Sequence, residues 1–340
     1  MRILAAHPGP NFSVHDVYVG WVEALRQLGV HVLEFDLSTR LTFYDSALME
    51  RDGEVRKALS PEAATRVAVG GIYSALYQAH ADVLLAVSGF FYDGLLLEKV
   101  RAHGTKVVLL HTESPYEDGR QLEIAQHADL NLINDPTNLE QFRAVAPTKY
   151  VPHSYRPHIH CPGPVDPKLN ADLAFVGTGY PSRVAYLEQM DLTGLDVLLA
   201  GNWQALTEDS PLRPYVAHEP AECLDNEQTV HVYRSAKVGL NLYRREAEAA
   251  HLAAGWAMGP REVELAACGA FFLRDSRPEG DEVLSMLPTV TDPGDASEKL
   301  RYWLARPAGR QEIAAKAREA IADRTFQNRA AELLRWLDKE

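Results

Sequence analysis

The chain has 340 residues with 46% hydrophobic and 24% charged residues, which excludes a largely disordered protein and predicts two domains rather than one. Its formal net charge of −13, from 34 basic and 47 acidic residues, disfavours generic binding to a nucleic-acid backbone. The three cysteines are far apart with no CxxC spacing, and no apolar run approaches about eighteen residues, so we expect neither a disulfide framework nor a membrane span. The opening MRILAAHPGP is too short in its apolar run for a signal peptide, so a cytoplasmic location is expected.

Short β-branched or leucine-rich runs alternate with helical patterns along the chain, which is typical of an α/β protein with parallel sheets. In the first half, strands are predicted at Ile3–Ala6, His31–Phe35, Val83–Val87, Lys106–Leu110, Leu130–Ile133 and Lys149–Val151. Helices are predicted at Val17–Leu28 and Pro61–Gln78. The apolar residues of the first helix recur at helical spacing, and Gly29 fits its C-terminal end.

A proline- and histidine-rich stretch follows over residues 151–167. Because prolines remove backbone donors and disfavour helix, we predict a linker over residues 156–170, after a first domain over residues 1–155. His153, His158 and His160 raise the alternative of a metal site. No acidic or cysteine cluster completes a ligand set beside them, so the linker is favoured and no metal is predicted.

The strand–helix pattern restarts after this stretch and predicts a second domain over residues 171–322. Strands are predicted at Ala171–Val176, Val197–Ala200, Val238–Leu242, Ala270–Leu273 and Thr289–Val290. Helices are predicted from Ser182 and at Glu227–Ser235, Pro260–Ala267, Ala296–Ala305, Arg310–Ala322 and Thr325–Leu337. The last helix has an apolar stripe that must be buried, formed by Phe326, Ala330, Leu333, Leu334 and Leu337.

A glycine turn, Gly177–Thr178–Gly179, leads from the first strand of this domain into a helix. Free backbone N–H groups at a helix N-terminus attract anions, and Arg183 adds a donor suited to a diphosphate. Residue 182 is Ser, so a full GxGxxG dinucleotide motif is absent. An ordinary tight turn with a solvated Arg183 is an equally good interpretation of this segment.

The segment GPREVELAACGAFFLRD, residues 259–275, carries a second polar group on a helix. Pro260 fits the first helical turn and Gly269 fits the helix end, so Arg261 and Glu264 share one helix face. Arg261 can bind a phosphate and Glu264 can accept from ribose hydroxyls. The alternative is a surface salt bridge, but the small apolar residues that follow indicate a packed helix whose polar face lines a site.

Other polar residues follow strand ends, where ligands bind in open α/β sheets. In the first domain these are Asn11, His15, Asp93 and Glu113, and a His or a carboxylate can take a proton from a hydroxyl. His15 and Glu113 rank level as candidate base, although a surface histidine is as good an interpretation of His15. Trp203 follows a strand of the second domain and is a candidate for stacking on a nucleobase, with a core position as the favoured alternative.

Several of these segments together resemble one known family, the CgeB-like (spore maturation protein) glycosyltransferases, within the GT-B superfamily. The resemblance is strongest over residues 171–338, in FVGTGYPSR, REVELAACGAFFL and RTFQNRAAELL. It extends to HTESPYEDG and LNLINDPTNLEQF in the first half. The sequence departs from the broader GT-B pattern in its first turn, which reads HPGPNFSVHD in place of a clean glycine motif.

The resemblance implies a GT-B fold, with two Rossmann-like domains facing across a cleft and the segment 323–340 crossing back onto the first domain. It implies that Glu264 binds the donor ribose, that Arg261 and Arg183 hold the diphosphate, and that Asn241 ends the strand before the sugar loop. GT-B enzymes generally act without metal, and no DxD motif stands where a metal-bridged diphosphate would need one.

Together these expectations predict a glycosyltransferase that needs no separate cofactor. Its co-substrate is predicted to be a nucleotide sugar, with UDP-sugar favoured. The acceptor stays open among a glycan, a protein, a small molecule and, least favoured, modified DNA. A GT-B sugar-nucleotide epimerase and a catalytically silent binding module are the alternatives. A nicotinamide oxidoreductase is disfavoured by the missing glycine motif.

Overall fold

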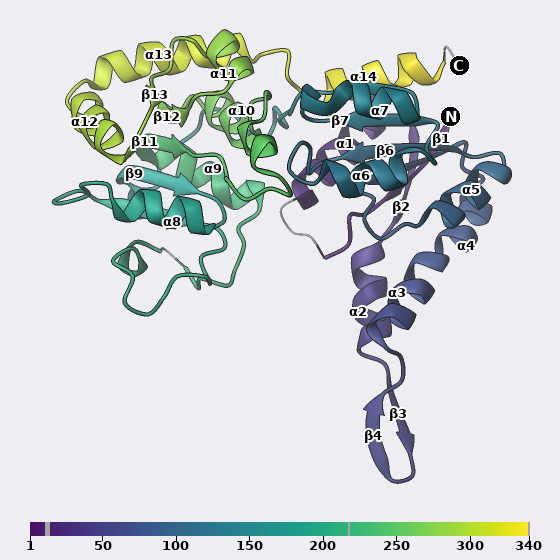
Figure 1. Ribbon diagram of the computed structural model, residues 1–340. Coiled ribbons are helices and arrows are strands. Elements are labelled where there is room, and N and C mark those ends of the chain that lie inside the picture. The colour runs from purple at the N-terminus through teal and green to yellow at the C-terminus, as the bar shows by residue number, and fades with distance from the viewer. Residues whose placement is uncertain (11–13, 217, 339–340) are drawn as a thin grey trace. The chain divides into compact units, whose positions relative to one another are not determined.

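The computed structural model describes residues 1–10, 14–216 and 218–338. The chain divides into two compact units, one of Met1–Val151 together with the segment from Ala330 onward, the other of Pro152–Arg329. Each unit is built on its own parallel sheet (Figure 1). Among the described residues, no helix combines the length and apolar character needed to cross a bilayer.

The first unit contains a six-stranded parallel sheet in the order β2-β1-β5-β6-β7-β8. The strands are β1 Arg2–Ala6, β2 His31–Phe35, β5 Val83–Val87, β6 Lys106–His111, β7 Leu130–Ile133 and β8 Thr148–Tyr150. All six predicted strands are confirmed with boundaries shifted by one residue at most. β5 is buried along its whole length, as expected for a central strand with both faces covered.

The helices of the first unit are α1 His15–Gln27, α2 Leu37–Asp45, α3 Pro61–Gly70, α4 Ile72–Ala79, α5 Gly94–Ala102, α6 Asp118–Ala125 and α7 Leu139–Val145. The prediction of one helix over Pro61–Gln78 was wrong, because two helices meet at Gly70 and Gly71. Each glycine inside a helix costs about 1 kcal/mol relative to alanine, so an adjacent pair favours a break.

A small antiparallel hairpin, β3 Leu48–Arg51 and β4 Glu54–Lys57, was not predicted. All eight strand residues are exposed, so they show no alternation of buried and exposed positions from which a strand is recognised. Asp52–Gly53 forms the turn, and both residues have positive φ, as a tight hairpin turn requires.

The second unit contains a five-stranded parallel sheet in the order β10-β9-β11-β12-β13. Its strands are β9 Ala171–Val176, β10 Val197–Ala200, β11 Ala236–Asn241, β12 Phe272–Asp275 and β13 Thr289–Val290. Its helices are α8 Pro181–Glu188, α9 Asn226–Ser235, α10 Pro260–Ala267, α11 Pro278–Val283, α12 Pro293–Leu304 and α13 Pro307–Ala320. β12 begins two residues later than predicted, because Ala270 N still donates to Leu265 O at the exit from α10.

The last helix, α14 Phe326–Leu337, begins in the second unit and continues into the first. Four residues of its predicted apolar stripe are buried, namely Phe326, Ala330, Leu333 and Leu337, whereas Leu334 is half-buried. Within the first unit, the Lys149 ammonium lies 6.0 Å from the centre of the Trp336 ring. The return of the C-terminal helix to the first unit is therefore confirmed.

Shortening Leu333 to alanine is expected to lower the free energy of unfolding of the first unit by about 2–3 kcal/mol, since the side chain is fully buried. Urea unfolding followed by circular dichroism measures the loss. Leu334→Ala is the matched control, and an equal loss in the two variants would contradict the placement of the stripe.

Candidate functional site

The glycine turn after β9 is held closely by the second unit's own residues. Gly177 N donates to Ala200 O and Gly179 N donates to Asn202 O, both at 2.8 Å. A Cβ on Gly177 would lie 3.1 Å from Cζ of Arg261, so the Arg261 guanidinium packs directly against the turn. The structure therefore brings together the two polar segments that the sequence singled out separately.

Trp203 belongs to the hydrophobic core, which corrects its assignment as a stacking residue. The side chain is fully buried and packs edge-on against Phe175, with ring centres 5.7 Å apart. A Cβ on Gly179 would come within 2.6 Å of the indole, so the backbone of the glycine turn covers part of the ring. A nucleobase cannot reach a face that is already in contact with protein.

Arg183, which was predicted to hold a diphosphate, makes structural contacts within the second unit. It is 6% exposed, and its guanidinium donates to Leu242 O at 2.9 Å and to Thr178 O at 3.1 Å. The guanidinium also lies over the Tyr180 ring at 5.2 Å. Arg183 therefore ties the glycine turn to the segment after β11. Half-buried Thr178 contributes its carbonyl to this link.

The N-terminus of α10 presents Arg261 and Glu264, both of which are half-buried. No hydrogen bond or ion pair of the Arg261 side chain is present within the described parts of the chain. Its donors therefore remain available beside the glycine turn. Pro260 occupies the first turn of the helix, and Glu262 Oε2 accepts from Gly259 N at 2.9 Å.

Glu264 lies among polar side chains from α9 and from the segment that contains Arg156. Tyr233 Oη, on α9, donates to Glu264 Oε2 at 3.1 Å. Burial raises the pKa of Glu264, while the charges of Arg261 and Arg156 and hydrogen bonds from Tyr233 and Asn226 act in the opposite direction. A carboxylate in this setting has a defined orientation and can accept further hydrogen bonds.

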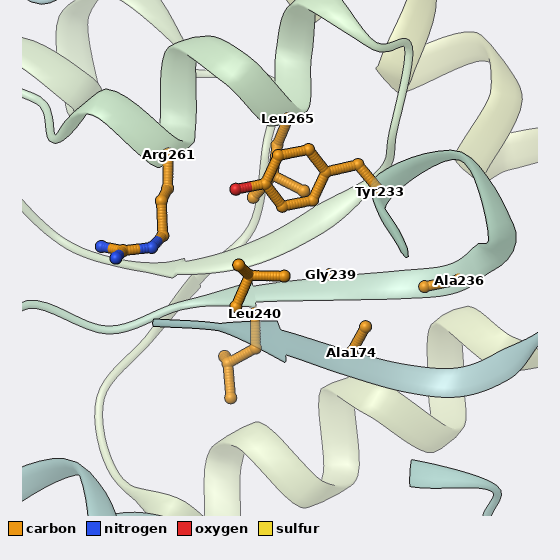
Figure 2. Close-up of a pocket in the computed structure, with 8 residues that line it drawn as sticks. Ala174, Tyr233, Ala236, Gly239, Leu240, Arg261 and Leu265 are labelled. Carbon is orange, nitrogen blue, oxygen red and sulfur yellow. The ribbon is translucent and has the colours of Figure 1, made fainter. Parts of the chain in front are cut away.

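Figure 2 shows Tyr233 with its hydroxyl directed to the side on which Arg261 lies, above Gly239 and Leu240 of β11. The cavity that these residues line has a volume of only about 10 Å³, room for roughly one water molecule. The cavity is thus a packing feature beneath the polar pair. It is not the volume that a ligand would fill.

Tyr233, Arg156 and Asn226 were not predicted as site residues. Tyr233 is one aromatic residue on an amphipathic helix, and Arg156 lies in the segment that we predicted to be a linker. Only the tertiary packing of α9 and of the segment around Arg156 near α10 places them beside Glu264, so no local sequence pattern could have identified them.

Asn241 ends β11 and is 3% exposed. Its Nδ2 has no hydrogen-bond partner within the described residues. An unsatisfied buried donor costs about 1–3 kcal/mol, and such groups persist where a ligand can satisfy them. Its position at the carboxyl end of a parallel strand agrees with the placement of ligands in α/β sheets.

Glu262 lies behind this face of α10 and is fully buried. It accepts a hydrogen bond from the Tyr243 hydroxyl, and its other oxygen lies 3.9 Å from the buried Arg274 guanidinium. Burial raises the pKa of Glu262 to about 7. The carboxyl therefore changes charge near neutral pH, at a position that supports the helix N-terminus.

Replacing Glu262 with glutamine is expected to flatten the pH dependence of stability. The native carboxyl titrates near pH 7 and an unfolded glutamate near about 4.3, so the native state holds an extra proton between these values. Its stabilising contribution is complete below about pH 4.3 and is lost as the pH rises through about 7, a change of about 4 kcal/mol.

Urea unfolding of the second unit at a series of pH values from acidic to neutral measures this effect. Glu298→Gln, on the exposed surface of α12, is the matched control and should retain the wild-type slope. Since burial also raises the pKa of Glu264 and Asp275, part of the slope should remain in Glu262→Gln. An unchanged slope in that variant would show that Glu262 does not titrate in this range.

In the first unit, Asp93 serves as the N-cap of α5, accepting from Leu96 N at 2.7 Å. This cap gives one carboxylate oxygen of Asp93 a structural role. Glu113 follows β6 and is half-buried, and its backbone N–H donates to Gln121 Oε1 at 3.2 Å. Asn11 lies outside the described residues.

His15 begins α1 and lies 3.0 Å from His7, measured between His15 Nδ1 and His7 Nε2. Burial, followed by the neighbouring His15, lowers the pKa of His7. The two rings border a cavity of about 430 Å³ that Tyr18, Glu34 and Asp36 also line. His7 directly follows β1, so the same strand-end rule that selected His15 could have identified it.

Residues 183–335 match the model of a family described as glycosyl transferase-like. Arg261 and Glu264 lie within this range. No curated protein matches the chain. Within the residues that the structure describes, no group of three or more His, Cys, Asp or Glu side chains is placed to hold a metal ion.

Solved structures match the chain over its full length. Sucrose-phosphate synthase from Thermosynechococcus elongatus has 14% identity and a TM-score of 0.64, covering 100% of this chain and 99% of its own. Trehalose-6-phosphate from E. coli bound with UDP-2-fluoro glucose has 12% identity and a TM-score of 0.63, covering 100% of this chain and 99% of its own. A putative UDP-N-acetylglucosamine 2-epimerase from Listeria monocytogenes has 14% identity and a TM-score of 0.60, covering 98% of this chain and 94% of its own.

These likenesses define the class of fold, a GT-B protein built from two Rossmann-like α/β units, and confirm the predicted fold class. Within that fold, residues 183–335 carry the similarity to the glycosyl transferase-like family.

Proposed function

We propose that the chain is a cytoplasmic, metal-independent glycosyltransferase of the CgeB-like type, which transfers a sugar from a nucleoside-diphosphate sugar. UDP is the favoured nucleotide. The acceptor is a hydroxyl compound among glycans, proteins and small molecules. The main support for this proposal is the position of Arg261 and Glu264, which lie together on α10 with Arg261 beside the backbone of Gly177. Both residues lie within the segment that matches the glycosyl transferase-like family.

Each of these groups has a chemical part in donor binding. Arg261, with no hydrogen-bond partner among the described residues, offers a planar set of donors to the diphosphate. Glu264, oriented by Tyr233, accepts from the ribose hydroxyls. The positive end of α10 and the Arg261 charge then stabilise the leaving nucleoside diphosphate without a metal ion.

Gly177, Thr178 and Gly179 support the proposal through their backbone. A side chain at Gly177 would crowd Arg261 and one at Gly179 would clash with Trp203, so both positions favour glycine, whose backbone can approach a phosphate closely. Asn241 Nδ2, unsatisfied among the described residues, is proposed to bind an oxygen of the donor sugar or phosphate. Arg183 and Trp203 act only by holding the turn in place.

For the acceptor, His15 and Glu113 remain the candidate bases of the first unit. The contact between His15 and His7 favours His15. His7 Nδ1 accepts from Gly9 N, so the Nε2–H of a neutral His7 donates to His15 Nδ1 and orients that ring, which leaves His15 Nε2 to take a proton from a hydroxyl. Asp93 is not retained, since its carboxylate caps α5.

Calorimetry with UDP, GDP and ADP tests the donor site, with UDP expected to bind most tightly. The proposal is overturned if no nucleoside diphosphate binds at about 1 mM. A dissociation constant of that size corresponds to a binding free energy of only about 4 kcal/mol, which a donor site must exceed.

Turnover assays with UDP-sugars then separate the possible activities. Transfer to an added acceptor supports the proposal. Conversion of the sugar without acceptor would identify an epimerase, the alternative that the likeness to the Listeria structure keeps in view.

A further inference from the structure

The β3–β4 hairpin extends from α2 and α3, away from the six-stranded sheet of the first unit (Figure 1). Large apolar side chains are exposed on it, with Leu48 at 66% and Val55 at 69% exposure. Phe43, near the end of α2, is 66% exposed. Each strand pairs only with the other among the described residues, so β4 has an open edge.

A two-stranded hairpin with both faces in water is marginally stable, whereas three or more strands with an apolar face can be stable. This hairpin buries none of its strand residues. Its conformation instead depends on the turn at Asp52–Gly53 and on the Lys57–Asp45 ion pair of 2.7 Å at its base. Pairing along the open edge would supply the missing strands.

The register of the hairpin defines its two faces. Glu50 is opposite Val55 and Leu48 is opposite Lys57, and these four residues share one face. Arg51 pairs with Glu54 and Met49 pairs with Arg56, and these four residues share the other face. On that face β4 therefore presents one negative charge, at Glu54, and one positive charge, at Arg56. These two charges lie one residue to either side of Val55.

We propose that β4 is a self-association edge, which pairs antiparallel with β4 of a second copy of this chain about Val55. In this symmetric register Val55 faces Val55 of the second copy. Glu54 of each copy faces Arg56 of the other, which forms two ion pairs on one face. The product is a four-stranded sheet with Val55 and Leu48 of both copies on the other face.

The neighbouring symmetric registers place like charges together. Pairing about Arg56 sets two arginines opposite each other, and pairing about Glu54 does the same with two glutamates. On β3, pairing about Met49 sets Leu48 against Glu50, and pairing about Glu50 sets two glutamates together. Only the register about Val55 combines an apolar contact with opposite charges, so the hairpin specifies one arrangement.

A lipid surface is a poorer occupant of the same apolar residues. The segment from Leu48 to Lys57 carries three basic residues, Arg51, Arg56 and Lys57, and three acidic residues, Glu50, Asp52 and Glu54. Its net charge is therefore zero. An anionic bilayer attracts basic segments, and this segment has no excess of positive charge for such attraction.

Sedimentation velocity of the full chain over a range of concentrations up to about 1 mM tests the proposal, because an interface this small predicts weak association. Wild-type protein should show a sedimentation coefficient that rises with concentration. Glu54→Arg, which sets two arginines against each other, should weaken association about tenfold or more. The double variant Glu54→Arg with Arg56→Glu restores both ion pairs and should restore association.

Glu50→Arg is the matched control, because it reverses a charge on β3 away from the paired edge and should leave association unchanged. All three substituted positions are exposed, so the variants should remain folded. The proposal is overturned if the wild type stays monomeric at every concentration. A wild type that stays monomeric but binds vesicles of phosphatidylcholine and phosphatidylserine would overturn it in favour of a lipid surface. It is also overturned if the double variant fails to recover association.

Discussion

Replacing Glu264 with glutamine is expected to weaken UDP binding about tenfold or more, since a charge-assisted hydrogen bond to a ribose hydroxyl contributes roughly 1.5–3 kcal/mol. In the wild type, Tyr233 Oη donates to the Glu264 carboxylate at 3.1 Å. Glutamine keeps the size of the side chain and an oxygen that can accept this hydrogen bond. The fold should therefore be retained. Burial already penalises the charged carboxylate, so its removal should not lower the melting temperature.

Calorimetric titration with UDP measures this loss, and thermal unfolding measures stability on the same samples. Glu298→Gln, which removes one acidic charge from the exposed surface of α12, is the control and should bind UDP as the wild type does. Unchanged affinity together with a lower melting temperature would make Glu264 a structural partner of Tyr233. In that case the ribose assignment fails, whichever nucleotide binds.

Truncating Trp203 to alanine is expected to cost the second unit about 3–5 kcal/mol of stability, the usual penalty for removing a buried large aromatic side chain. The indole contacts Phe175 and supports the turn at Gly179, so the cavity left behind would lie beneath the proposed phosphate-binding turn. Trp203→Phe should cost less. It keeps an aromatic ring and removes an indole N–H that has no partner within the described residues.

Chemical denaturation of both variants measures the stability change, and UDP affinity is measured under conditions in which each variant is fully folded. A folded Trp203→Phe protein should retain UDP affinity within about threefold, less than 1 kcal/mol. If Trp203→Phe instead loses UDP affinity while its free energy of unfolding is unchanged, Trp203 contacts the nucleotide and the stacking prediction holds.

Much of the fold was predictable from sequence because the main elements bury a periodic set of apolar residues. The strands of both sheets, the helix Pro260–Ala267 and the stripe on the last helix are recognisable from local spacing alone. Elements without such a pattern were missed or merged. The hairpin β3–β4 buries nothing, and the break at Gly70–Gly71 interrupts an otherwise regular helical pattern.

For the candidate site, the sequence by itself determined which segments carry polar groups at strand ends and at a helix N-terminus. It identified Arg261 and Glu264 as neighbours on one helix face, because a spacing of three residues places two side chains together on any helix. Only the tertiary structure decided which polar groups stay available. It placed Arg183 and Trp203 inside the second unit and set Tyr233 against Glu264, since burial and contacts between α9 and α10 depend on how distant segments pack.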